Sequence, residues 1–422
     1  MLAGAAHAQL RLPSVTGLSP LGRLPLVQRV DPVVDQVLAP VDLAAARLQE
    51  IARRARANRR ELDRDPHGEL IVRAELLAQP SGAPARDALA AAGFKALREE
   101  TLDGLDDAFV VLRPPSGMAL PEAVERARAI DPAGAYDYHH LYEGSGSAGA
   151  PAAAAVASAP AVAAAAGTLR VGLIDSGVDA RHPAFARATV QRHGCDDGAH
   201  PAAHGTAVAS LMIGEDGSFR SALPGATLYA ADVYCDAPTG GSVEAIAREL
   251  AWLARMQVAV VNVSLVGPPN LVLQRVVAQA VARGMLVVAA VGNDGPAAPP
   301  LYPASWPGVV GVGAVDARLR LLPEGARGPQ VMFVAPGADM AAAANGARGF
   351  AAVRGTSFAA PLVAGLLAAQ MQDAAPAAAR DAVARLASSA REPAGTPPRD
   401  GFGRGLVGEA LRTAPDAVAL VH

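Results

Sequence analysis

The chain has 422 residues, of which 51% are hydrophobic, 18% are charged and only 4% are aromatic. This length predicts two or three domains, and the apolar content excludes a wholly disordered chain. The net charge of −3 lacks the basic excess typical of nucleic-acid binding, so nucleic acid is not an expected partner.

Residues 1–66 combine a signal remnant, a proline-rich segment and a helix. Ala6-His7-Ala8 has the small-x-small pattern of a signal-peptide cleavage site, although a charged n-region and a full apolar region are missing. Residues 41–64 carry apolar side chains at helical spacing, and we expect a solvated helix that packs loosely on the rest. Together with the cysteine usage described below, this predicts an exported protein, periplasmic or secreted.

Residues 67–143 form a small predicted domain. The expected strands and helices follow the order β-α-β-β-α-β, which is the ferredoxin-like split motif: 69–77, 85–93, 95–100, 107–113, 120–130 and 134–142. Residues 144–167 are rich in Gly, Ala, Ser and Pro, which is typical of a flexible, protease-accessible linker. Because this linker is mostly alanine and contains two prolines, no membrane-spanning helix is predicted.

Residues 168–422 have a different pattern, in which apolar strands alternate with helices. The expected elements are strands at 169–174, 227–233, 258–264, 285–290 and 309–315 and helices at 207–213, 243–256 and 271–283. Repeated β-α units of this kind predict an α/β domain with a doubly wound, mainly parallel sheet. In such a sheet the functional residues follow the carboxyl ends of the strands.

Three residues in this domain have the chemistry of a nucleophilic hydrolase. Asp175 ends the first strand, His204 stands at a helix start, and Ser357 opens the helix that runs towards Gln370. Taken singly, each is also explained as a turn, cap or surface residue. Together they supply a hydroxyl nucleophile, an imidazole that takes its proton, and a carboxylate that orients the imidazole.

A fourth residue has the chemistry of an anion-stabilising donor. Asn293 follows a strand, and its amide can donate to a developing oxyanion, with the Ser357 backbone N–H as a second donor at the start of a helix. The alternative is a simple turn residue before Asp294-Gly295.

The region from about 169 to 415 resembles the catalytic domain of the subtilisin-like serine peptidases (subtilases). The motifs that carry the resemblance occur in family order: Asp175-Ser176-Gly177, His204-Gly205-Thr206, Asn262-Val263-Ser264-Leu265, Gly292-Asn293, and Gly355-Thr356-Ser357 with Ala359-Ala360-Pro361. The resemblance implies an endopeptidase acting on polypeptides, with Asp175, His204 and Ser357 as the triad and Asn293 as the oxyanion residue.

Members of this family are commonly made with a β-α-β-β-α-β propeptide, and residues 67–143 resemble it in pattern and position. The resemblance implies an intramolecular inhibitor whose tail enters the active-site cleft. We expect a self-processing zymogen that is cut between about Tyr142 and Gly167, in the exposed linker.

The resemblance also implies a substrate groove in which an extended peptide pairs with two backbone segments. The matching residues are Ser264, Leu265, Val266 and Gly267 on one side and Ala289, Ala290, Val291 and Gly292 on the other. Val266 and Val291 stand where the family usually has glycine and a small residue, so we expect a narrow pocket that prefers small or medium apolar side chains. The alternative is that Val266 points into the core.

The two cysteines, Cys195 and Cys235, allow one disulfide, which in an exported protein braces the loop before His204. Two free thiols and a zinc site that adds His193 and His200 are the alternatives, and the zinc spacing fits no standard pattern. Asp196-Asp197 and Asp236 are better explained as acidic residues of surface loops than as ligands of a calcium ion. No metal and no cofactor are predicted.

Two other functions are weighed against a peptidase. A catalytically idle subtilase fold that serves as a binding module is disfavoured by the complete triad and Asn293. A dinucleotide-binding enzyme needs G-x-G-x-x-G after the first strand, whereas this chain places Asp175 and Asp179 there.

Overall fold

The structure is a computed structural model, and it describes residues 40–144, 147–148, 169–195, 198–346, 348–392 and 401–420. The expected signal remnant, the proline-rich segment and most of the expected linker lie outside these residues. All of the described residues belong to one compact unit, residues 38–422.

The N-terminal domain is an antiparallel sheet with two helices. Its elements are β1 (Leu62–Arg64), β2 (Leu70–Gln79), α2 (Ala83–Ala91), β3 (Lys95–Leu102), β4 (Asp107–Arg113), α3 (Leu120–Ile130) and β5 (Ala135–His140). Within the sheet the strands lie in the order β1-β2-β4-β3, and β5 also pairs with β2. Apart from β1, the order along the chain is the β-α-β-β-α-β order of the split motif.

Helix α1 (Pro40–Ala57) precedes this domain and is docked more firmly than its sequence suggested. The helix ends at Ala57, and residues 62–64 form strand β1, so the helix expected over 41–64 is too long. Ile51 is 1% exposed because it packs with Leu70 and Leu141 of the N-terminal domain. The expectation of loose packing is therefore wrong, although most other side chains of α1 are half-buried or exposed, as expected for a solvated helix.

The C-terminal domain is built on a seven-stranded sheet in which every pair of neighbours is parallel. The order β17-β16-β15-β13-β8-β12-β9 confirms the doubly wound fold class. The strands are β8 (Arg170–Asp175), β9 (Thr189–His193), β12 (Thr227–Asp232), β13 (Val260–Val263), β15 (Leu286–Ala290), β16 (Val310–Val315) and β17 (Val331–Pro336).

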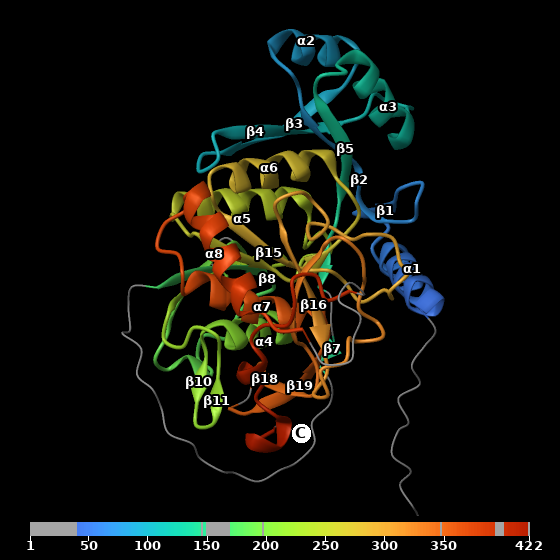
Figure 1. The fold of residues 1–422 in the computed structure, drawn as a ribbon. Coiled ribbons are helices and arrows are strands. Elements are labelled where there is room, and N and C mark those ends of the chain that lie inside the picture. The colour runs from blue at the N-terminus through green and yellow to red at the C-terminus, as the bar shows by residue number, and fades with distance from the viewer. Residues whose placement is uncertain are drawn as a thin grey trace, which may run out of the picture. The chain divides into compact units, whose positions relative to one another are not determined.

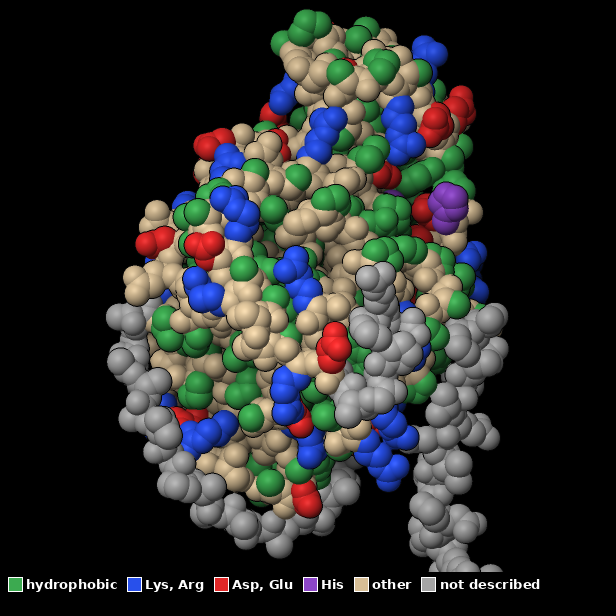
Figure 2. Space-filling model, in the orientation of Figure 1, with side chains coloured by type: hydrophobic (Ala, Val, Ile, Leu, Met, Phe, Trp, Pro, Cys, Tyr) green, Lys and Arg blue, Asp and Glu red, His purple; other side chains and the backbone are tan. Residues whose placement is uncertain are grey.

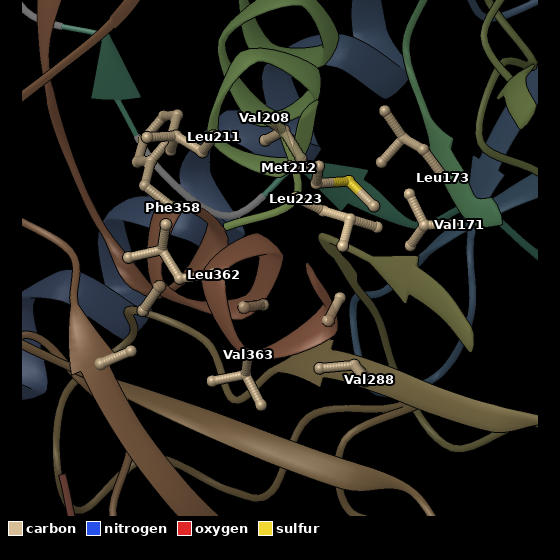
Figure 3. Packing of buried hydrophobic residues seen from close by; sticks show 14 of the residues in the cluster. Val171, Leu173, Val208, Leu211, Met212, Leu223, Val288, Phe358, Leu362 and Val363 are labelled. Atoms are coloured by element: carbon tan, nitrogen blue, oxygen red, sulfur yellow. The ribbon is translucent and has the colours of Figure 1, made fainter. Parts of the chain in front are cut away.

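Helices cover both faces of this sheet (Figure 1). One apolar cluster joins the sheet to α4 (Ala203–Ile213), α7 (Thr356–Ala368) and α8 (Pro376–Ser389), and a second joins it to α5 (Val243–Arg255) and α6 (Leu271–Ala282). In the first cluster Phe358 of α7 lies beside Leu211 of α4 (Figure 3). Among the described residues, no helix combines the length and apolarity that crossing a membrane requires.

Shorter elements complete the domain. They are the strands β10 (Glu215–Asp216), β11 (Phe219–Arg220), β14 (Leu265–Val266), β18 (Met340–Ala343) and β19 (Phe350–Arg354) and the short helices η1 (Pro183–Phe185), η3 (Glu409–Leu411) and η4 (Pro415–Ala417).

The sheet of the N-terminal domain packs on α5 and α6. Leu102 and Phe109 are fully buried in the same cluster as Leu250 of α5, and β3 contacts α5. Figure 2 shows basic and acidic side chains interspersed on the face in view. The contact of this sheet with α5 and α6 fixes where the chain leaves the N-terminal domain. It therefore also fixes where the tail of the domain, residues 141–144 and 147–148, begins its course.

That tail forms two short strands with the C-terminal domain. β6 (Glu143–Gly144) pairs antiparallel with β14, and β7 (Ser147–Ala148) pairs antiparallel with β19. Because β19 leads directly into the turn before Ser357, the tail is anchored on both sides of the candidate active site.

Candidate active site

Asp175 and His204 meet at the carboxyl edge of the central strands. Asp175 is the last residue of β8 and is fully buried, while His204 is the second residue of α4. The Nδ1–H of His204 donates to Asp175, at 2.8 Å from Oδ1 and 3.0 Å from Oδ2. Since a carboxylate only accepts, this contact fixes the proton of a neutral imidazole on Nδ1 and leaves the lone pair on Nε2.

The carboxylate of Asp175 is itself held in place. Its Oδ1 accepts from the backbone N–H of Ser176 at 2.7 Å and from the Ser176 hydroxyl at 3.1 Å. Ser176 Oγ in turn accepts from the N–H of Gly205 at 3.0 Å. The turn after β8 and the first turn of α4 are therefore joined around the Asp175–His204 pair.

The pKa of His204 lies above its ordinary value. Burial alone lowers this pKa, but the negative charge of Asp175 and its hydrogen bond outweigh burial and raise it. Nε2 of His204 is buried and has no hydrogen-bond partner among the residues that the structure describes. An imidazole held in one orientation with an available basic nitrogen has the properties of a general base.

Ser357 is fully buried and lies in the first turn of α7, next to Phe358, whose ring centroid is 5.4 Å from that of His204. The backbone before it turns at Gly355, where φ is 138°. The carbonyl of Ser357 accepts from the hydroxyl of Ser264 at 3.0 Å. These contacts bring the start of α7 to the imidazole and to the end of β13.

Asn293 lies beyond the end of β15, and its amide is oriented by the first turn of α7. The backbone N–H of Thr356 donates to Asn293 Oδ1 at 3.1 Å. The Nδ2 atom is buried and has no partner within the described part of the chain. A buried amide donor without an acceptor is costly, which points to an acceptor that arrives with a substrate.

The tail of the N-terminal domain lies between two segments of the C-terminal domain. On one side Leu265 pairs with Gly144 and Val266 with Glu143. On the other side the N–H of Tyr142 donates to the carbonyl of Gly241 at 2.7 Å. This geometry is β-strand addition, in which backbone hydrogen bonds hold an extended peptide.

Gly144 lies against the face of the imidazole. A Cβ built on Gly144 would be 3.6 Å from both Cε1 and Nδ1 of His204. Gly144, the tail residue that pairs with Leu265, is thus within reach of the candidate base.

Tyr142 is fully buried, and its side chain enters the C-terminal domain. Its hydroxyl donates to the carbonyl of Pro268 at 2.7 Å, and its ring packs directly on Gly267, where a Cβ would come within 2.7 Å. The carbonyl of Tyr142 accepts from the hydroxyl of Tyr234 at 3.0 Å. The tail is therefore anchored by a side chain as well as by its backbone.

The other groove residues expected from the sequence are part of the buried framework. Ala290 and Val291 are fully buried, and Val266 is 4% exposed. Gly292, with φ of 101°, donates its N–H to Thr356 Oγ1 at 3.2 Å. Gly241, which the sequence did not single out, makes a direct contact with the tail.

Helix α1 also reaches the cleft, which the sequence did not indicate. A cavity of about 440 Å³ beside His204 is lined in part by Arg54, Glu143 and Tyr234. The Arg54 guanidinium pairs with Glu143 at 3.3 Å and donates to the carbonyl of Pro238 at 3.0 Å. One arginine of α1 thus contacts both the tail and the segment that receives it.

Cys195 and Cys235 form a disulfide, with a Cα–Cα distance of 5.2 Å. Both sulfurs are used in this bond, so the pair offers no thiolate to a zinc ion, and Nδ1 of His193 instead contacts Glu249. Asp236 is largely exposed and contacts His200 at 3.4 Å, whereas Asp196 and Asp197 lie outside the described residues.

Comparisons with known proteins agree on one family. The profile described as "Subtilase family" matches residues 166–405. The chain is 32% identical over 214 residues to subtilisin E of Bacillus subtilis (strain 168), covering 47% of this chain and 54% of that protein. It is 38% identical over 168 residues to subtilisin Savinase of Lederbergia lenta, covering 39% of this chain and 61% of that protein. The chain thus spans about half the length of subtilisin E.

Solved structures show the same fold. The structure superposes on fervidolysin from Fervidobacterium pennivorans, a keratinolytic enzyme related to subtilisin, with a TM-score of 0.64 and 19% identity, covering 81% of this chain and 61% of that one. The patellamide maturation protease PatA matches with a TM-score of 0.51 and 26% identity, covering 58% of this chain and 95% of that one.

Proposed function

Because the chain belongs to the subtilase family, we propose that it is a serine endopeptidase in which Ser357 is the nucleophile, His204 the general base and acid, and Asp175 the residue that orients His204. The observation that carries this proposal is the bond from His204 Nδ1–H to Asp175, which leaves a buried Nε2 with its lone pair and no partner among the described residues.

The reaction uses each of these groups in turn. Nε2 of His204 takes the proton of the Ser357 hydroxyl while its oxygen attacks the peptide carbonyl, and the resulting oxyanion accepts from Asn293 Nδ2 and the Ser357 N–H. His204 then gives the proton to the departing amine, which leaves an acyl-enzyme. Water, activated by the same imidazole, hydrolyses this ester and restores the serine.

The N-terminal domain acts in this proposal as an intramolecular inhibitor and as the first substrate. Its tail pairs with β14 through residues 143–144 and with β19 through residues 147–148. Three peptide bonds separate Gly144 from Ser147, and we propose that the enzyme cuts one of them, inside the wider window expected from the sequence. In each case the residue before the cut is small: Gly144, Ser145 or Gly146.

This small residue fits the proposed specificity. In this proposal Val266, which pairs with Glu143 of the tail, narrows the pocket that receives the side chain before the scissile bond, so the enzyme prefers small or medium apolar residues there. Val291, expected beside it, is fully buried in the core cluster. A peptide library that is cleaved mainly after bulky aromatic residues would contradict this preference.

We also propose that the protein works outside the reducing cytoplasm. The Cys195–Cys235 disulfide supports this location, because disulfides persist mainly in exported proteins.

The deciding experiment compares the wild type with Ser357→Ala, and with Ser388→Ala as a matched control on the exposed face of α8. The wild type and the control should degrade casein, react with a fluorophosphonate and yield a mature chain that begins at residue 145, 146 or 147. Ser357→Ala should stay full length and inert. A wild type that neither processes itself nor reacts with the probe would favour the alternative, an idle binding module.

A further inference from the structure

The disulfide joins two loops that serve different parts of the site. Cys195 follows β9 and lies in the loop that leads to His204, whereas Cys235 follows β12 and lies in the segment 233–241. This segment, which we call the receiving segment, has no helix or strand and runs from β12 to the start of α5. The bridge is its one covalent link to another loop among the described residues.

The receiving segment contacts the tail backbone at Tyr142, two residues before Gly144. The Tyr234 hydroxyl donates to the carbonyl of Tyr142 at 3.0 Å, and the Gly241 carbonyl accepts from the N–H of Tyr142 at 2.7 Å. A Cβ on Gly241 would come within 2.2 Å of the Tyr142 carbonyl oxygen. Such a close fit between two backbones tolerates little displacement of the receiving segment.

The conformation of the segment is not one that its residues adopt readily. Cys235 and Asp236 are consecutive non-glycine residues with φ of 51° and 53°, in the left-handed region. Such residues persist where the surroundings hold them. Asp232 provides one restraint, because its Oδ1 accepts from the N–H groups of Tyr234 and Cys235 at 2.9 and 3.1 Å. The disulfide provides a second restraint, at Cys235 itself.

We propose that the Cys195–Cys235 disulfide is a positioning element for substrate binding: it holds the receiving segment so that a peptide is bound through the residue equivalent to Tyr142, well before the scissile bond. The inference rests on the proposed peptidase function. It predicts that the bridge raises affinity for long substrates and contributes little to the hydrolysis of short ones that do not reach Gly241.

Two peptides taken from the tail separate these effects. One reproduces residues 140–148 and reaches both Tyr234 and Gly241, while the other reproduces residues 144–148 and reaches neither; both contain the same three candidate bonds. The comparison uses self-processed wild type and the Cys195→Ser/Cys235→Ser double variant, with hydrolysis followed by chromatography and mass spectrometry.

In the double variant, the ratio of kcat/KM for the long peptide to that for the short peptide should fall about tenfold, through a higher KM for the long peptide. This factor corresponds to losing one or two net hydrogen bonds. Tyr234→Phe keeps the bridge but removes one of these contacts, so the same ratio should fall in the same direction. This second variant also gives the answer if the double variant does not fold.

The possible results are distinguishable. If the ratio of kcat/KM for the long peptide to that for the short peptide is unchanged in the double variant, the inference is overturned. If only Tyr234→Phe folds, an unchanged ratio in that variant overturns it. An equal loss on both peptides overturns it as well, because a merely structural role of the bridge would act on both. If the wild type cleaves neither peptide and does not process itself, the proposed function fails, and the inference fails with it.

Discussion

The backbone N–H of Thr356 donates to Oδ1 of Asn293, and this single contact orients the whole amide group. Because a backbone N–H needs an acceptor, the oxygen of the amide must face Thr356, and Nδ2 must face the other way. The donor proposed for the oxyanion is therefore set before a substrate binds.

Replacing Asn293 tests this arrangement. Asn293→Ala should lower kcat by about 10²–10³-fold with little change in KM, a magnitude taken from subtilisin, a member of the same family. Asn293→Asp keeps the acceptor for Thr356 but turns the donor into a negative charge, so its kcat should be lower still. Steady-state kinetics on one peptide substrate measures both. A kcat within threefold of wild type in Asn293→Ala would remove Asn293 from the reaction.

The pH profile should report the raised pKa of His204. The general base must be neutral, so kcat/KM should rise with pH, with a midpoint above 6.5, the ordinary value for histidine. A midpoint below 6.5 would show that burial, which lowers this pKa, outweighs Asp175. In Asp175→Asn the midpoint should shift down and the residual rate should fall by orders of magnitude.

The same titration affects stability. A group whose pKa is higher in the folded than in the unfolded protein stabilises the fold most at low pH. The His204 contribution is therefore complete below about pH 6.5 and is lost as the pH rises through the folded-state pKa. Denaturation of Ser357→Ala with and without Asp175→Asn, at pH 5 and pH 9, should show a larger difference at pH 5.

Arg98 links the N-terminal domain to α5 of the catalytic domain. It pairs with Glu75 at 2.8 Å within its own domain and donates through Nε to Glu244 at 2.6 Å. Burial raises the pKa of Glu75, but His139 and Arg98 outweigh it and hold this pKa at about 2. Arg98→Gln in the Ser357→Ala background should lower the free energy of unfolding. The expected loss is only about 1–2 kcal/mol, because solvent screens the partly exposed guanidinium.

Arg86→Gln is the matched control, since Arg86 pairs only with the exposed Glu99 of the same domain among the described residues. Its effect in urea denaturation should stay under about 0.5 kcal/mol. Equal losses in the two variants would mean that the contact with Glu244 does not stabilise domain docking.

Tyr142 should be the main anchor of the tail. Tyr142→Ala removes a fully buried ring and should cost about 3–5 kcal/mol in the unfolding of full-length Ser357→Ala. Tyr142→Phe keeps the ring and loses the bond to Pro268, which predicts a cost of about 1–2 kcal/mol. Both values come from urea denaturation. If the two variants lose equal stability, the hydroxyl and not the ring carries the anchoring.

The sequence predicted the parallel sheet well because its strands are buried on both faces. Uninterrupted apolar runs such as Val258–Val261, bounded by helices, leave few other interpretations. Strand β9 lacks such a run, whereas β17, β18 and β19 are apolar but follow one another with no helix between them, outside the regular alternation of strands and helices. Their pairing is determined by tertiary contacts that no local pattern records.

The sequence suggests the proposed triad, Asp175, His204 and Ser357, because nucleophilic hydrolysis demands particular residue types. It carries no such signal for contacts that the backbone makes. Gly241 binds the tail through its carbonyl, and Arg54 donates to the carbonyl of Pro238. Neither contact was expected, because a main-chain acceptor has no signature in the sequence. The periodicity of α1 indicated an apolar face but not the surface against which it packs.

The position of β8 in the sheet has a consequence for the newly made polypeptide. This strand is the first of its sheet to leave the ribosome, yet its neighbours β12 and β13 are more than 50 residues further along. The N-terminal domain closes its own sheet at His140, before any of these partners has been translated. Domains generally fold in order of synthesis, so α5 and α6 emerge to meet a surface that is already formed.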